Sequence, residues 1–149
     1  MDDLDPAVLI ERLQLQPHPE GGWYAETWRD APAGHQPRGS GSCIYYLLEA
    51  GQRSHWHTVD ATEIWHYYAG AGLELCLAAD EHEAISRHRL GPAIMRGERP
   101  QVIVPAGHWQ SAEAMNGWCL VGCTVSPAFE FASFTMAEPG WTPGGGSTP

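Results

Sequence analysis

The sequence has no lysine, and its eight arginines are outnumbered by eighteen aspartate and glutamate residues. The formal net charge is therefore −10 at pH 7 with histidine counted as neutral. The arginines are scattered and form no basic run. Nucleic acids and anionic membrane surfaces are bound through clustered positive charge. We therefore expect neither nucleic acid nor membrane as a partner.

Long apolar runs are also missing. No stretch approaches the roughly 20 apolar residues that a membrane-spanning helix needs. The first residues, MDDLDPAV, are acidic and lack the basic-then-apolar pattern of a secretory signal peptide. We expect a cytoplasmic protein. At 149 residues the chain is long enough for one hydrophobic core and too short for two.

Several motifs that carry chemistry are absent. The four cysteines are spread along the chain and form no CxxC pair of the kind found in structural zinc sites. Their neighbours are strand-like and apolar, which indicates buried free thiols. No GxSxG, P-loop or GxGxxG element is present. The sequence therefore supports neither a serine hydrolase nor an enzyme with a nucleotide cofactor.

One helix is predicted, over residues 5–15. Asp5 suits the N-cap, Pro6 suits the first turn, and Leu9 and Leu13 share a face at helical spacing. The prolines and glycines of QPHPEGG should end it.

Most of the remaining chain consists of short apolar segments separated by turn residues at intervals of roughly 8–12 residues, the spacing of an antiparallel sandwich or barrel. The predicted strands are 22–28, 42–50, 54–58, 63–69, 73–78, 85–90, 101–105, 108–114, 118–125 and 129–136. We expect one all-β domain over residues 1–140, with its barrel at about 20–136 and a flexible tail over 141–149.

Residues 54–70, SHWHTVDATEIWHYYAG, gather histidines and acids where a core strand is expected. Because alternate side chains of a strand share a face, His55 and His57 should point the same way, and Trp56 the opposite way. If the strands on either side of residues 59–61 pair as a hairpin, Glu63 joins the two histidines. Two imidazoles and a carboxylate suit a divalent metal such as nickel, iron, manganese or zinc.

The same stretch resembles the first motif of the cupin superfamily, and VPAGHWQ resembles the second. The matching residues are Gly51, His55, His57, Glu63, Gly70, Pro105 and Gly107. In two places the chain departs from the motifs. The step from His57 to Glu63 is one residue longer than usual. Gln110 stands in place of the second-motif histidine, with His108 two positions earlier. Either His108 or Gln110 could face the cavity, and the turn more naturally delivers Gln110, a weak metal ligand.

A closer resemblance is to the small single-domain cupins of bacteria and fungi, whose function is largely unassigned. It is carried by HPEGGWYAETWR, DATEIWHYYAG, PAGHWQSAE and LVGCTVSPAFEF. The resemblance implies a double-stranded β-helix (jelly-roll) barrel with a ligand cavity, usually assembled as a homodimer. Proteins of this kind are often compared with sugar-nucleotide epimerases of the same fold.

Other residues are candidates for the cavity. In HPEGG, residues 18–22, the glycines permit close backbone approach, and Glu20 or His18 could reach a ligand. In the next strand Tyr24, Glu26 and Trp28 should share one face, with Thr27 and Arg29 on the other. The seven tryptophans exceed what a small core needs, so we expect some to line a pocket. The predicted ligand-binding residues are Glu20, Trp65, Trp109, Gln110 and Cys123.

Three classes of function follow. The first is a metal-independent isomerase or epimerase of a small polar or sugar-like metabolite. In it His57 is the base, Glu63 its partner and Tyr24 the candidate acid. The second is a metal-dependent oxygenase or lyase in which His55, His57, Glu63 and Gln110 hold one divalent ion. The third is a small-molecule-binding protein without catalysis.

Overall fold

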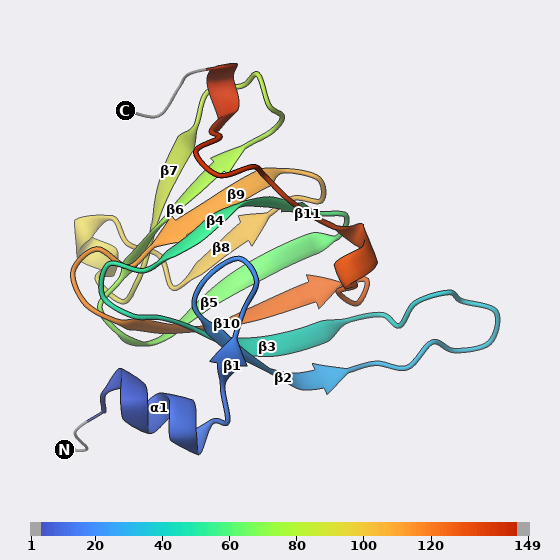
Figure 1. Ribbon diagram of the computed structural model, residues 1–149, viewed down its shortest axis with the longest axis horizontal. Helices are drawn as coiled ribbons and strands as arrows, with labels where there is room; N and C mark the ends of the chain where they lie inside the picture. Colours follow the sequence, from blue (N-terminus) through green and yellow to red (C-terminus); the bar gives the residue numbers. More distant parts are fainter. Residues whose placement is uncertain (1–3, 146–149) are drawn as a thin grey trace.

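The computed structural model describes residues 4–145, and two antiparallel sheets form its body (Figure 1). One sheet has the order β1-β2-β3-β10-β5-β8 and the other β11-β4-β9-β6-β7. The strands are β1 (Gln16–Pro17), β2 (Trp23–Arg29), β3 (Ser42–Leu48), β4 (Arg53–Val59), β5 (Thr62–Gly70), β6 (Leu73–Ala78), β7 (Ser86–Leu90), β8 (Gln101–Val104), β9 (Trp109–Glu113), β10 (Cys119–Ser126) and β11 (Phe134–Met136). The all-β jelly-roll expectation is confirmed.

The helix α1 (Pro6–Arg12) begins as predicted, because the Asp5 carboxylate accepts a hydrogen bond from the Val8 backbone N–H at 2.9 Å. It ends before the predicted boundary, and Gln14 adopts a positive φ of 56°. Leu9 packs in a cluster with Leu47 and Leu120, so α1 covers part of the outer face of the six-stranded sheet. Within residues 4–145, no helix combines the length and apolar character needed to cross a bilayer.

The space between the sheets is divided along the strands. From β3, Tyr46 and Leu48 enter the main core, and from β5 Trp65 does so. Nearer the beginning of the same two strands, Ile44 and Glu63 face a cavity instead. Further core residues come from both sheets: Leu73, Leu75, Leu77, Leu90, Val102, Val104, Ala112, Ala114, Cys119, Val121 and Cys123.

The hairpin considered for residues 54–70 does not form. β4 pairs with β9 and β11 in one sheet, whereas β5 pairs with β10 and β8 in the other. The turn at residues 59–61 therefore carries the chain from one sheet to the opposite one, as Figure 1 shows. His57 therefore points into the barrel from one sheet, and Glu63 points into it from the other.

A bulge in β4 overturns the expected shared face of His55 and His57. Ser54 lies opposite Ala112 and His57 opposite Gln110, so β4 uses one residue more than β9 over this step. Such a bulge reverses the alternation of side chains beyond it. His57 is consequently buried, while the His55 ring leaves the interior and its Nε2 lies 3.1 Å and 3.0 Å from the carbonyl oxygens of Ala137 and Glu138.

The C-terminal region differs from expectation in two further ways. Of the strand predicted at 129–136, only β11 is formed, and Phe131–Ser133 is a 3₁₀ turn. Two other 3₁₀ turns are Ile94–Arg96 and Pro143–Gly145. The expected tail at 141–149 begins with Trp141, which packs against Trp56 and Trp109. Residues 146–149 lie outside the described part of the chain.

Candidate active site

A cavity of about 210 Å³ opens between the sheets where β2, β3, β4 and β5 meet the segment before β11. Its inner end is polar and buried, its sides are aromatic or aliphatic, and its mouth carries an ion pair. The residues lining it are Gln16, His18, Glu20, Tyr24, Glu26, Arg29, Ile44, His57, Val59, Glu63, Phe129, Phe131 and Phe134. A concave, mostly apolar space with a few convergent polar groups is the usual form of a small-molecule site.

His57 and Glu20 form a buried ion pair at the inner end. His57 Nε2 lies 2.9 Å from Glu20 Oε2, and His57 Nδ1 donates to the His55 carbonyl at 2.7 Å. Burial alone lowers the pKa of His57, but the Glu20 carboxylate more than offsets this and raises the pKa to about 9. Although burial raises the pKa of Glu20, the charge of His57 lowers it overall. The pair is therefore imidazolium and carboxylate at neutral pH.

The loop that supplies Glu20 is shaped by two glycines. Gly21 and Gly22 both have positive φ, and a Cβ on Gly21 would collide with the Arg53 carbonyl oxygen. The loop therefore lies directly on β4, where the Glu20 carbonyl accepts the backbone N–H of His55 at 2.9 Å. The β4 bulge and the HPEGG loop thus satisfy one another's backbone groups and place Glu20 beside His57.

Glu63 is held by a different set of partners. The Trp65 indole N–H donates to Gln110 Oε1 at 2.9 Å, and the Gln110 amide donates through Nε2 to Glu63 Oε1 at 2.8 Å. Because Trp65 occupies the amide oxygen, Gln110 can only present N–H groups to Glu63. Burial raises the pKa of Glu63, His57 and Gln110 counteract it in part, and the result is about 7.

His18 and Tyr24 form a second polar wall. The Glu20 backbone N–H donates to His18 Nδ1 at 3.1 Å, so the ring proton resides on Nε2. Burial lowers the pKa of His18, which keeps its imidazole neutral. The His18 ring meets the Tyr24 ring edge-on, with centroids 4.5 Å apart. Both residues line the cavity and offer N–H and O–H donors.

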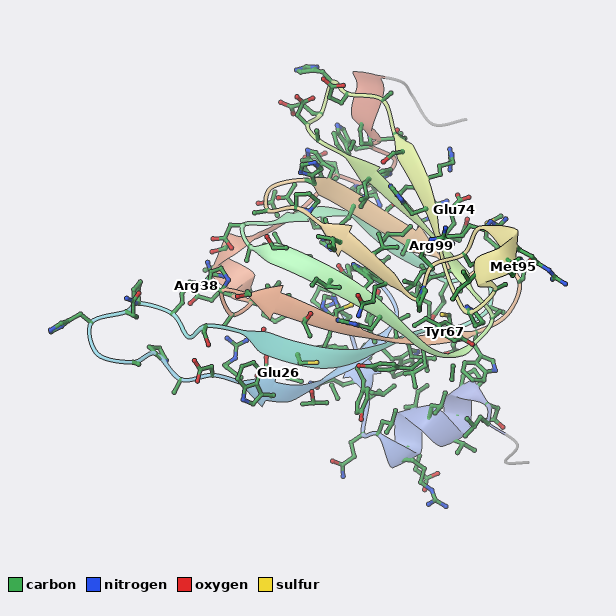
Figure 2. The ribbon with its side chains drawn as sticks, turned by 180° about the vertical axis from the view of Figure 1, so that it is seen from behind. Glu26, Arg38, Tyr67, Glu74, Met95 and Arg99 are labelled. Carbon is green, nitrogen blue, oxygen red and sulfur yellow. The ribbon has the colours of Figure 1, made fainter. Side chains whose placement is uncertain are left out.

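A second bulge, in β2, places the ion pair of Arg29 and Glu26 at the mouth of the cavity. In β2, Glu26 lies opposite Ile44 and Trp28 opposite Cys43, which leaves Thr27 as the extra residue. Beyond it Arg29 lies opposite Ser42 and faces the cavity, whereas Trp28 is half exposed on the outside. The sequence-based faces of Trp28 and Arg29 were therefore wrong. Figure 2 labels Glu26 on β2, close to where the long loop to β3 extends.

The predicted site residues separate into three groups. Glu20, Tyr24, His57 and Glu63 line the cavity. Trp65, Gln110 and Cys123 are buried behind it, and burial raises the pKa of the Cys123 thiol well above its usual value. His55 and Trp109 lie outside: Trp109 packs on Trp141, with ring centroids 4.4 Å apart. Gln110, and not His108, takes the inward position.

Sequence reasoning missed the three phenylalanines and Arg29. Phe129, Phe131 and Phe134 pack edge-to-face with centroids 4.9–6.0 Å apart and close one side of the cavity. They lie in a segment predicted as a regular strand, and only its density of aromatic residues could have indicated their place. Arg29 was hidden by the β2 bulge, which has no marker in the sequence.

The donor set as arranged does not fit a metal ion. Both ring nitrogens of His57 are engaged, the Gln110 oxygen is taken by Trp65, and His55 is outside. Across residues 4–145, no group of three or more histidine, cysteine, aspartate or glutamate side chains could hold one.

A family model described as cupin superfamily (DUF985) matches residues 7–137. The chain belongs to the cupin superfamily. No curated protein matches this cupin. Protein SO0799 from Shewanella oneidensis is 36% identical, with a TM-score of 0.83 over 91% of this chain and 85% of that one. A hypothetical protein from Leishmania major is 30% identical, with a TM-score of 0.82 over 90% and 88%.

More distant structures share the fold alone. Oxalate decarboxylase from Bacillus subtilis is 16% identical to this cupin, with a TM-score of 0.61 over 80% of this chain and 29% of that one. CapF, solved with the inhibitor 3-isopropenyl-tropolone, is 12% identical, with a TM-score of 0.60 over 83% and 34%.

Proposed function

We propose that this cupin binds a small polar metabolite in its cavity and moves a proton on it without a metal, as an isomerase or epimerase does. The observation that carries the proposal is Glu63, a buried carboxyl group that lines the cavity and has a pKa of about 7. A general acid–base group works best when its pKa lies near the working pH. A carboxyl group that served packing alone would not need to line the cavity.

Glu63, and not His57, is the proton-carrying group in this proposal. His57 is charged and has a partner on each nitrogen, so it has no lone pair with which to accept a proton. Its positive charge instead favours the ionised form of Glu63. Gln110 donates to one carboxylate oxygen of Glu63, and the Cys123 thiol also hydrogen-bonds the carboxyl group, which faces the cavity.

The donors on the opposite wall complete the chemistry. Glu63 takes the proton from a carbon next to a carbonyl group, and the electron pair of the broken C–H bond moves to the carbonyl oxygen. The Nε2–H of neutral His18 and the hydroxyl of Tyr24 are the donors available to that oxygen. Delivery of a proton from the Tyr24 hydroxyl to the other face of the same carbon, with the abstracted proton left on Glu63, gives an epimer. Return of the abstracted proton to a neighbouring carbon, with the matching transfer between oxygens, gives an isomer.

Deuterium exchange tests the proposal whichever product forms, because the exchange reports the proton-abstraction step itself. The protein is incubated in D₂O with a set of ketoses, uronic acids and oxo acids, and loss of the C–H signal is followed by proton NMR. We expect exchange with the wild type, none with Glu63→Gln, and wild-type exchange with Glu83→Gln, whose side chain is exposed outside the cavity. Exchange that persists in Glu63→Gln would overturn the role of Glu63.

The other two classes predict different results. A ligand-binding protein without catalysis would bind members of the set and exchange none of their protons. A metal-dependent oxygenase or lyase would contain about one metal ion per chain when purified without chelator, as measured by elemental analysis. The geometry of His57 and Gln110 leads us to expect far less than one.

A further inference from the structure

Arg29 is the one arginine that lines the cavity among the described residues, and the chain has no lysine. It is placed there by the β2 bulge, since without Thr27 as the extra residue its side chain would point outward beside the sheet. Bulges often re-aim a side chain next to a functional site. Arg29 therefore places a positive charge at the mouth of the cavity, in a chain whose net charge is −10.

The guanidinium of Arg29 is only partly occupied. Its Nε and one Nη2 hydrogen donate to the two oxygens of Glu26, at 3.0 Å and 2.8 Å. A guanidinium has five N–H donors, so three make no hydrogen bond to the described residues. The side chains of Arg29 and Glu26 are 40% and 37% exposed, and exposed ion pairs contribute little to folding. The ion pair fixes the orientation of the guanidinium and leaves its other N–H groups for a ligand.

The other residues that line the cavity limit the kind of molecule that can place an anionic group at Arg29. Between the mouth and Glu63 lie Ile44, Val59 and the three phenylalanines, and the volume is about 210 Å³. A ligand with an anionic group at Arg29 needs a short apolar or ring-shaped middle and a polar end to match this lining. Glu26 and the charge of the whole chain repel a dianion such as a phosphate ester more strongly than a carboxylate.

We propose that Arg29 binds the carboxylate of a small oxo or hydroxy acid, whose oxygen-bearing carbon lies over Glu63. This substrate class rests on the function proposed above. Arg29 sets specificity by a planar, two-point contact with the carboxylate, as arginine does wherever planar anions are recognised. Glu26 competes with the ligand for the same guanidinium and limits its affinity.

The experiment measures binding by NMR saturation transfer and calorimetry, with short oxo and hydroxy carboxylates, each paired with its uncharged primary amide. We expect the wild type to bind carboxylates better than amides, and Arg29→Gln to weaken carboxylate binding by at least about tenfold while amide binding is unchanged. Arg53→Gln is the matched control, because Arg53 is an exposed arginine in an ion pair with Glu113 and does not line the cavity. Its carboxylate affinity should equal that of the wild type.

Glu26→Gln should have the opposite effect on carboxylate affinity. Loss of the competing carboxylate should tighten carboxylate binding severalfold. The proposal is overturned if no carboxylate binds at millimolar concentration, if amides or phosphate esters bind as well as carboxylates, or if Arg29→Gln binds them like the wild type. All titrations are repeated in Glu63→Gln, which we expect to bind the acids without exchanging their protons. Absence of exchange in the wild type together with Arg29-dependent binding would refute the proposed reaction and leave this inference standing.

Discussion

His57 and Glu20 meet at 2.9 Å inside the barrel, although one lies on β4 and the other in the loop before β2. Both side chains are almost completely buried. Two opposite charges in such surroundings depend on each other, because either alone would be a buried, uncompensated ion. This pairing makes Glu63, and not His57, the titrating group of the cavity.

The first prediction concerns this ion pair. His57→Leu leaves the Glu20 carboxylate buried without its cation, so we expect the free energy of unfolding to fall by about 3–5 kcal/mol. The double variant His57→Leu/Glu20→Gln removes both charges and should regain more than half of that loss. Urea unfolding at pH 7 measures both. If the double variant is less stable than His57→Leu, the two residues are not coupled as described.

A second prediction concerns pH. The folded protein binds the Glu63 proton more tightly than an unfolded chain does, since the pKa is about 7 against an ordinary 4.5. The stability that this provides is fully present below pH 4.5 and is lost as the pH rises through 7. Glu63→Gln cannot ionise, so it should gain about 3 kcal/mol relative to the wild type between pH 4.5 and pH 8. Parallel unfolding curves for the two proteins across this range would contradict the assignment.

The third prediction concerns Trp65 as a positioning residue. Trp65→Phe keeps a ring beside Tyr46 but removes the N–H that holds the Gln110 oxygen. The amide can then turn and present its oxygen to Glu63, which favours the protonated acid. We expect the pKa of Glu63 to rise by about one unit, the worth of one hydrogen bond. Carbon-detected NMR titration of the carboxyl group measures it.

Trp141→Phe is the control for Trp65, because Trp141 packs on the outside against Trp56 and Trp109. It should leave the Glu63 titration unchanged. A purely structural role for Trp65 would lower stability without moving that titration.

The last prediction concerns assembly. The outer face of the six-stranded sheet is only partly covered by α1, and Trp28, Tyr68 and Ile103 are about half exposed on it. We propose that this face joins two copies of the chain, as exposed apolar patches of this kind commonly do. Light scattering at micromolar concentration should give twice the chain mass, and Ile103→Glu should reduce it to the monomer. Met95→Glu, on the exposed turn marked in Figure 2, should leave the dimer intact. A monomeric wild type would rule the dimer out.

Much of the fold was predictable because its signals are local. The Asp5 cap, the alternation of apolar residues and the regular turn residues indicated the helix and nine of the strands. The turn Pro105–Gly107 also indicated that Gln110 points inward. Whether β4 and β5 pair as a hairpin could not be predicted, because a short turn between two strands is compatible both with pairing and with a crossing to the opposite sheet.

The sequence by itself determined an all-β cupin barrel and the kinds of side chain that gather in it: His57, Glu63, Gln110 and the HPEGG loop. Only the tertiary structure decided their partners. Two bulges reversed the faces of His55 and Arg29, and the fit of the HPEGG loop on β4 brought Glu20 to His57. Alternation along a strand depends on neighbouring residues, whereas a bulge and an ion pair depend on which distant backbone lies alongside. Packing of the whole barrel decides which distant segments lie side by side.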